Sequence, residues 1–192
     1  MKTRDQILES ADQLFYQQGY EHTSFSDIAK AVRISRGNFY HHFKTKDEIL
    51  HAVIDLRANN TRAMLEEWES GHEDPMARIR CYLQILLTNG SNISLYGCPV
   101  GTLSSELAKL DHASQGDAVG IFTLFREWLG KQFSLLGCGS DADALAMHVL
   151  AWSQGVATLV NAFPDEAFVL REVNHMCAWL QARVSDPGKA GL

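Results

Sequence analysis

Apolar residues recur at helical spacing along most of the chain, and no stretch alternates apolar and polar residues as a half-buried strand would. The first periodic segment ends at Gly19, a residue typical of helix C-termini. Its apolar stripe consists of Ile7, Leu8, Ala11, Leu14 and Phe15. The four prolines all fall between periodic segments, as expected of breaks between helices. The pattern predicts an all-α protein with about nine helices, over residues 3–18, 24–32, 35–42, 46–68, 76–88, 99–111, 113–136, 141–163 and 165–184.

The segments between these helices also carry signals. Residues 89–97 are rich in Gly, Ser and Asn, and we expect them to interrupt the helical structure. Pro99 suits the first position of the helix that follows, and Asp141 and Asp165 suit the N-caps of the last two helices. We expect three parts: a helix-turn-helix domain over residues 1–46, a helical domain over residues 47–184, and a disordered tail over residues 185–192.

The composition is that of an ordinary soluble protein, with 46% hydrophobic and 21% charged residues. The first residues have no apolar core typical of a signal peptide, and no apolar run reaches the roughly 18 residues that a membrane helix needs. We therefore expect a cytoplasmic protein. The four cysteines form no C-x-x-C pair, so reduced thiols are expected rather than disulfides, and neither a metal site nor a cofactor is predicted.

The net charge of −6 argues at first against a nucleic-acid partner. The charge is unevenly distributed, however. Residues 1–46 contain seven Lys or Arg and five Asp or Glu, whereas residues 47–192 contain ten and eighteen. The basic surface is thus expected at the N-terminal end, where placed contacts rather than bulk charge must provide any affinity for DNA.

Residues 24–43 predict two helices that are too short to be stable alone, so they must pack on the first helix. Their inward face would consist of Ile28, Ala29, Val32, Ile34, Phe39 and Phe43. The outward residues are short, polar and able to form hydrogen bonds, as a helix that enters the major groove requires. They are Ser24, Ser26, Ser35, Arg36, Gly37, Asn38, Tyr40, His41 and His42, with Arg33 and Lys46 beside them.

The same region resembles the tetracycline-repressor (TetR) family of transcriptional regulators. The resemblance is carried by Gly19-Tyr20, Thr23-Ser24, Ile28-Ala29 and, most specifically, by residues 35–50, SRGNFYHHFKTKDEIL. It implies a dimeric DNA-binding regulator with phosphate contacts from Ser24, Tyr40, His42 and Lys46, and base contacts from Arg36, Gly37 and Asn38. Arg33 departs from the pattern, because family members often have glycine at this turn. If its backbone is left-handed, arginine is mildly unfavourable there.

Other interpretations of these residues are less specific. A Tyr-His-His run on a surface helix is usually a solvated face, and adjacent histidines diverge by about 100°, so they do not converge on a metal. Residues 51–184 contain no G-x-S-x-G, H-E-x-x-H or phosphate-binding loop, and Ser104-Ser105-Glu106 has no neighbouring histidine to complete a triad. We therefore predict that the protein is not an enzyme. The alternative function is a small-molecule-binding protein with no role at DNA.

The last two predicted helices, residues 141–163 and 165–184, are rich in small and apolar residues. The first of them is apolar nearly all round, which indicates burial on both sides. The family resemblance implies that two such helices from each subunit form a four-helix dimer interface; the alternative is that both belong to the core of one subunit. A two-fold dimer would read a palindromic operator with half-sites about 34–36 Å apart.

Helices within residues 46–136 would then enclose an effector pocket. Its aromatic density suits a small apolar or aromatic molecule, although any one of these residues fits a plain core position as well. The candidate lining residues are Leu65, Trp68, Tyr82, Leu86, Cys98, Leu103, Leu107, Phe122, Phe125, Trp128, Trp152 and Phe163.

Cys98 lies in the run Gly97-Cys98-Pro99, immediately before a predicted helix. A thiolate at a helix N-cap is stabilised by the positive end of the helix. The run is similar to a Gly-Cys motif in a TetR subgroup that includes the repressor of N-ethylmaleimide reductase, some members of which respond to electrophiles or oxidants. Cys98 is accordingly a candidate electrophile sensor, and the competing interpretation is a cysteine that only packs. The predicted mechanism is a repressor that such an effector releases from its operator.

Overall fold

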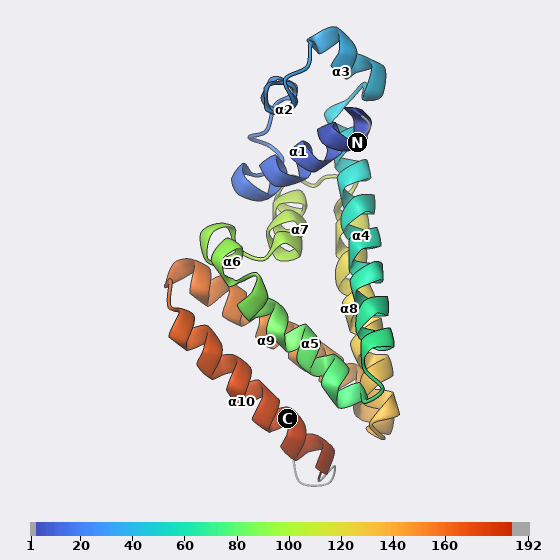
Figure 1. Cartoon of the computed structure of the whole chain (residues 1–192), viewed down its shortest axis with the longest axis vertical. Helices are drawn as coiled ribbons and strands as arrows, with labels where there is room; N and C mark the ends of the chain where they lie inside the picture. The colour runs from blue at the N-terminus through green and yellow to red at the C-terminus, as the bar shows by residue number, and fades with distance from the viewer. Residues whose placement is uncertain (1–2, 186–192) are drawn as a thin grey trace. The chain divides into compact units, whose positions relative to one another are not determined.

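Residues 3–185 are described by the computed structural model, apart from the side chains of Arg36 and Ser185. This part of the chain is helical and contains no strand, which confirms the predicted all-α class (Figure 1). The helices are α1 (Thr3–Gln18), α2 (Phe25–Val32), α3 (Arg36–His42), α4 (Lys46–Gly71), α5 (Pro75–Thr88), α6 (Gly90–Tyr96), α7 (Pro99–Lys109), α8 (Gln115–Leu135), the short 3-10 helix η1 (Gly139–Asp141), α9 (Ala142–Ala162) and α10 (Glu166–Ser185). Of the tail predicted over residues 185–192, Ser185 is instead the last residue of α10, and residues 186–192 lie outside the described residues.

One helix was not predicted. α6 occupies part of the segment that the sequence favoured as an interruption. Its composition is poor for a helix, but Ile93 is buried and the side-chain amide of Asn161, on α9, donates to the Ser94 carbonyl at 2.9 Å. Packing in unit 2 therefore overrides the local preference of glycine, serine and asparagine for turns. The helix ends at Gly97, whose φ of 79° suits glycine.

The two predicted N-caps of the last helices differ. Asp165 accepts a hydrogen bond from the Phe168 amide at 3.0 Å and caps α10 as expected. Asp141 makes no side-chain capping bond to α9. Its carboxylate instead accepts from the Arg183 guanidinium at 2.8 Å, because a buried arginine is a stronger partner than an exposed helix terminus.

The chain divides into two compact units. Unit 1 contains residues 1–61 and 99–121, and unit 2 contains residues 62–98 and 122–192. This division follows packing, whereas the boundary predicted after residue 46 separates two proposed functions and stays a prediction. None of the described helices is long and apolar enough to cross a membrane.

In unit 1, the apolar stripe of α1 packs against α2 and α7. Ile7, Ala11 and Phe15 are buried, as predicted, and the beginning of α4 contributes Ile49, Leu50 and Val53 to the same core. These residues supply the burial that α2 and α3 are too short to obtain on their own.

In unit 2, α10 lies against both α5 and α9, and α6 lies against α9 (Figure 1). The nine buried residues of α9 alternate at helical spacing with exposed ones, so this helix is covered on one side only. The prediction that α9 is buried on both sides is therefore not met within one subunit.

Candidate DNA-binding surface

The turn between α2 and α3 has the geometry of a helix-turn-helix. Arg33 ends α2 in the left-handed conformation, with φ 59° and ψ 41°. Its amide donates to the Lys30 carbonyl at 3.1 Å, and the next amide, of Ile34, donates to the Ala29 carbonyl at 3.2 Å. This pair of bonds is the Schellman arrangement, which normally favours glycine at the position of Arg33. The backbone of Arg33 is thus left-handed, the conformation in which an arginine is mildly unfavourable.

Serine residues begin both short helices. The hydroxyl of Ser24 accepts from the Asp27 amide at 3.2 Å, and the Asp27 carboxylate accepts from the Ser24 amide at 3.0 Å, which completes a capping box. The Ser24 hydroxyl also donates to that carboxylate at 2.5 Å, and these bonds lower the pKa of Asp27. At α3, the hydroxyl of Ser35 accepts from the Asn38 amide at 3.3 Å. The caps satisfy helix termini that face solvent.

The inward side of the two helices is apolar and aromatic. Ile28, Phe39 and Phe43 are almost completely buried, and Ala29 is 6% exposed. Val32 and Ile34, also predicted to face inward, are only partly buried. Phe25 packs edge-on against Phe39 with ring centroids 5.1 Å apart and also contacts the Tyr40 ring at 5.7 Å. The aromatic contacts fix α3 relative to α2, which a seven-residue helix could not achieve by itself.

The outward side of α3 is polar. Gly37, Asn38, Tyr40 and His41 are exposed, and His42 is half-buried. A methyl group added at Gly37 would meet no atom within 4 Å, so the surface is open at that point. Among the flanking predicted residues, Ser24, Arg33 and Ser35 are exposed and Ser26 is half-buried. The side chain of Arg36 lies outside what the structure describes.

Lys46 has a partner in the protein itself, which the sequence did not reveal. Its ammonium donates to the carbonyls of Tyr20 at 3.0 Å and Glu21 at 3.3 Å, and lies 4.1 Å from the centre of the Tyr20 ring. Lys44 donates to the Tyr40 carbonyl, at the end of α3. Both lysines therefore brace the helix-turn-helix in addition to any contact they make with DNA.

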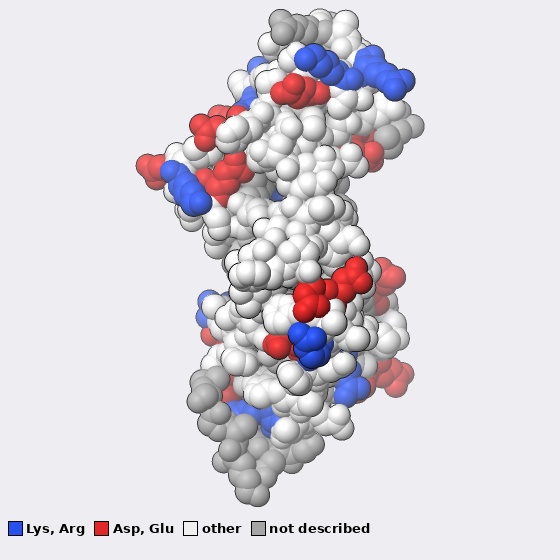
Figure 2. All heavy atoms as spheres, turned by 90° about the vertical axis from the view of Figure 1, so that its left-hand side faces the viewer, with Lys and Arg blue, Asp and Glu red and all other residues white. Residues whose placement is uncertain are grey.

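Residues 1–46 carry only a small excess of positive charge. On the face drawn in Figure 2, charged side chains of both signs are interspersed among the described residues. This agrees with the small excess of basic residues in residues 1–46. Placed hydrogen bonds must consequently carry more of the affinity for a polyanion than the overall field does.

In unit 2, most of the predicted effector-pocket residues are packed side chains. Tyr82 and Phe125 contact each other with centroids 5.4 Å apart, and Trp68 and Trp128 do so at 5.6 Å. The Tyr82 hydroxyl forms a 2.8 Å hydrogen bond with Ser153, and burial raises the pKa of this tyrosine. Leu65 and Leu86 are also buried, Cys98, Phe122 and Trp152 are half-buried, and Phe163 is exposed. Leu103 and Leu107 are buried in unit 1 instead.

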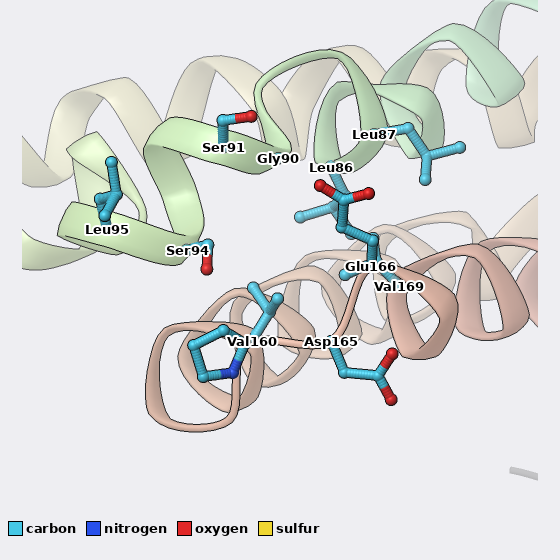
Figure 3. A pocket seen from close by; sticks show the side chains of 11 residues that line it. Leu86, Leu87, Gly90, Ser91, Ser94, Leu95, Val160, Asp165, Glu166 and Val169 are labelled. Atoms are coloured by element: carbon cyan, nitrogen blue, oxygen red, sulfur yellow. The ribbon is translucent and has the colours of Figure 1, made fainter.

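The predicted pocket residues do not line one common cavity among those that the structure shows. Leu86 contributes to a cavity of about 490 Å³ formed by α5, α6, the end of α9 and the start of α10 (Figure 3). Leu65 and Trp128 contribute to a shallow hollow of about 280 Å³, and Phe163 to one of about 190 Å³. Sequence reasoning missed the largest of these, because part of its wall, Gly90, Ser91, Ser94 and Leu95, comes from the segment that was expected to be non-helical, and the rest comes from the distant ends of α5, α9 and α10.

A short polar-faced helix, joined to the preceding helix by a left-handed turn and packed against it, is the arrangement of a helix-turn-helix DNA-binding protein. Comparison with known proteins specifies the family. The sequence pattern of the bacterial regulatory proteins of the tetR family matches residues 7–53. The transcriptional regulator TcmR of Streptomyces glaucescens is 39% identical over 164 residues, which are 83% of this chain and 72% of that protein. The chain belongs to the tetR family and is a DNA-binding transcriptional regulator, not an enzyme.

Solved structures extend the likeness to both units. A TetR transcriptional regulator from Legionella pneumophila has a TM-score of 0.83 at 26% identity, covering 93% of this chain and 97% of that one. Escherichia coli NemR in its reduced form has a TM-score of 0.74 at 20% identity, covering 91% and 95%. The second likeness concerns the fold alone. A small-molecule-binding protein with no role at DNA, the alternative function, does not fit this family.

Proposed function

We propose that the protein is a dimeric repressor that binds a palindromic operator through α3 and is released by a small-molecule or electrophile effector. The observation that carries the DNA-binding part is the outward face of α3. The exposed rings of α3, Tyr40 and His41, lie in its C-terminal half, so the N-terminal part can approach base edges closely.

The residues divide by the groups that they offer. Asn38 has the amide that pairs with adenine, Arg36 has the guanidinium that pairs with guanine, and Gly37 leaves room for the bases. Phosphate contacts are assigned to Ser24, Tyr40, His42 and Lys46, with Arg33, Ser26, Ser35 and His41 at the margin. The Ser24 hydroxyl must turn away from Asp27 to donate to a phosphate.

Two substitutions on α3 test this assignment. Gly37→Ala fills open space in the free protein, so its stability should not fall, yet the added methyl group should weaken binding to DNA. Asn38→Ala should cost roughly 1–3 kcal/mol at one base pair and relax specificity there. Fluorescence anisotropy with the DNA upstream of the gene measures both, and Asn60→Ala, an exposed asparagine on α4, is the matched control.

Either of two results would contradict the assignment. Gly37→Ala could bind DNA as tightly as the wild type, or Asn38→Ala could lose affinity equally for all sequences. A uniform loss is the behaviour expected at a phosphate contact, for example of Lys46→Ala, which should also reduce the salt slope by about one.

Dimerisation is proposed through α9 and α10. The uncovered side of α9 carries small and apolar residues: Ala144, Met147, Ala151, Gly155, Thr158, Leu159 and Ala162. Small residues permit close helix contact, and a second copy would bury Met147 and Leu159, which are 44% and 47% exposed. Ala151→Glu should shift the protein to monomer in analytical ultracentrifugation, whereas Ala63→Glu, on α4, should not. A dimer unaffected by Ala151→Glu would exclude this interface.

The effector is proposed to bind in unit 2. It must bind the released conformation more tightly than the DNA-bound one, since only differential affinity shifts the equilibrium. The packed aromatic residues and the 490 Å³ cavity offer two different sites. Saturation-transfer NMR with a panel of small aromatic compounds, repeated on Leu86→Trp, distinguishes them, because the added ring would occupy the cavity. If no compound that relieves repression contacts unit 2, this part of the proposal fails.

Cys98 is proposed as the reactive thiol in the electrophile version of this mechanism, by analogy with the N-ethylmaleimide reductase repressor subgroup. Burial raises the pKa of the other three thiols, Cys81, Cys138 and Cys177, which disfavours their reactive thiolates. Cys98 immediately precedes Pro99, the first residue of α7. Mass spectrometry after timed labelling with N-ethylmaleimide measures the four rates. If Cys98 reacts no faster than the others, and Cys98→Ser keeps induction, it only packs.

A further inference from the structure

The loop between α1 and α2 is held by a carboxylate from α7. One oxygen of Glu106 accepts from the Tyr20 amide at 2.9 Å, and the other accepts from the Glu21 amide at 2.9 Å. Tyr20 and Glu21 are consecutive, so the two oxygens of one carboxylate accept from two adjacent peptide amides. Hydrogen bonds to an ionised acceptor are the stronger ones. Glu106 therefore fixes both the position and the direction of this loop.

Gly19 shows how closely α7 approaches. Its φ is +89°, and a Cβ atom at this residue would lie 2.9 Å from a Glu106 carboxylate oxygen. Glycine ends α1 and also leaves room for the carboxylate. Gly19 therefore meets two requirements: it adopts the left-handed conformation at the helix C-terminus, and it leaves space for the Glu106 carboxylate.

The carbonyl groups of the same two residues, Tyr20 and Glu21, are bound by a side chain from α4. The Lys46 ammonium donates to the Tyr20 and Glu21 carbonyls, so two residues have both their amides and their carbonyls engaged by charged groups. The Tyr20 side chain is 5% exposed, and its hydroxyl donates to Asp47 at 2.5 Å. This hydroxyl lowers the pKa of Asp47. The ring of His112, a residue that follows α7, packs edge-on against the Tyr20 ring, with the ring centroids 5.3 Å apart.

A second link joins α7 to α1. The Arg57 guanidinium, from α4, donates to the Asp12 carboxylate at 2.6 Å and to the Pro99 carbonyl at 2.7 Å. The Arg57 side chain is 10% exposed and that of Asp12 is 31% exposed, so the ion pair is partly shielded from solvent. The first residue of α7 is thereby tied to the middle of α1, while Glu106 ties the body of α7 to the end of α1.

We propose that Glu106 is a positioning residue for DNA binding. Glu106 accepts from the Tyr20 and Glu21 amides while Lys46 donates to the carbonyls of the same residues, and this sets the orientation in which unit 1 presents α3. The loop leads directly into Ser24 and α2, so its direction determines where α2 begins. Glu106 itself contacts neither base nor phosphate in this role. The proposal rests on the proposed function, because orientation matters only if two copies of α3 read one operator.

The contact is tested first without DNA. Glu106→Gln keeps the size of the side chain, but its amide nitrogen cannot accept from a peptide N–H. We expect hydrogen exchange at the Tyr20 and Glu21 amides, followed by NMR, to accelerate about tenfold, the effect of losing one charge-assisted hydrogen bond. Glu9→Gln, an exposed residue on α1, makes the same change in charge and should leave both rates unaltered.

The second arm uses an operator selected from random sequences with the wild-type protein. Glu106→Gln should bind it about tenfold more weakly than Glu9→Gln at equal salt, with circular dichroism unchanged. The slope of log affinity against log salt should be the same for both, because no phosphate contact is lost. Inserting one base pair between the half-sites should weaken the wild type more than Glu106→Gln. A purely structural role would not change this tolerance of spacing.

The outcomes separate the two proposals. If the Tyr20 and Glu21 amides exchange equally in both variants, Glu106 does not hold the loop. If exchange accelerates but affinity and spacing tolerance match the Glu9→Gln control, the contact does not position α3. If the wild type selects no operator, or binds it as a monomer, the proposed function fails, and the exchange result still decides whether the contact exists.

Discussion

The helix-turn-helix and α9 obtain their stability in different ways. α2 and α3 contain eight and seven residues, expose polar side chains, and depend on serine caps and a few buried aromatic rings. α9 contains 21 residues and buries nine of them. A helix that must reach into a groove cannot bury its own outward face, so its position has to be fixed by neighbours. In unit 1 these neighbours include charged residues, which hold backbone atoms directly.

The comparison also shows where polar groups are placed. In unit 1, Glu106, Lys46 and Asp47 converge on the loop before α2. In unit 2, the Tyr82 hydroxyl is buried with Ser153, and the ion pair of Lys131 with Glu69 lies at the surface. Hydrogen bonds to a loop fix its direction, whereas a buried hydroxyl pair chiefly avoids the cost of an unsatisfied polar group.

The largest expected effect comes from a buried aromatic ring of α3, for which an exposed aromatic ring in unit 2 serves as the comparison. Phe39→Ala, at a side chain 1% exposed, should lower the free energy of unfolding by about 3–5 kcal/mol and abolish DNA binding. Phe163→Ala, at a side chain 71% exposed in unit 2, should cost less than about 0.5 kcal/mol. Urea denaturation measures both. Equal losses would show that burial of the Phe39 ring is not what stabilises the helix-turn-helix.

A smaller effect, of opposite sign, is expected at the turn. Arg33→Gly should raise the free energy of unfolding by about 0.5–1 kcal/mol, because relief of the left-handed strain exceeds the extra entropy of glycine in the unfolded chain. Arg33→Ala keeps the strain and should not stabilise. A thermal shift in both variants would instead attribute the effect to the charge of the arginine.

An effect of similar size, but dependent on pH, is expected at Tyr20. Tyr20 lowers the pKa of Asp47, so this carboxylate stabilises unit 1 above the ordinary aspartate pKa of about 3.9, and the contribution is lost as pH falls through the lower folded value. Tyr20→Phe should cost about 0.5–1 kcal/mol at pH 7 and reduce the further loss of stability between pH 7 and pH 3. Tyr40→Phe, at a half-exposed ring, is the control. If the stability of the wild type and of Tyr20→Phe depended on pH in the same way, Asp47 would not contribute to the loss of stability in acid.

Local patterns were sufficient for much of the fold. The stripe of α1, the glycine after it and the serines before α2 and α3 each predicted what the structure shows, because caps and helical periodicity act over a few residues. Pro99 was correctly placed at the start of α7 for the same reason. The aspartates show the limit of such signals: Asp165 caps its helix, while Asp141 binds Arg183.

Features that join distant residues could not be predicted. α6 forms in a segment whose own composition opposes it, because α9 offers Ile93 a buried site. The triplet Ser104-Ser105-Glu106 indicates nothing beyond a possible catalytic group in the sequence, because a carboxylate separated from its amide partners by 85 and 86 residues carries no local signal. Lys46 was assigned to phosphate, and the carbonyls that it holds are also distant in sequence.

The sequence by itself determined the all-α class, the helix-turn-helix and the polar surface of α3, since these follow from spacing, capping and the exposed side chains of a short segment. Only the tertiary structure decided which charged residues hold that segment in place, that α6 exists, and where unit 2 leaves a cavity. The physical reason is range: caps and periodicity are set by neighbours in the chain, whereas the grip of Glu106 on residues 20 and 21 exists only after α7 has packed beside α1.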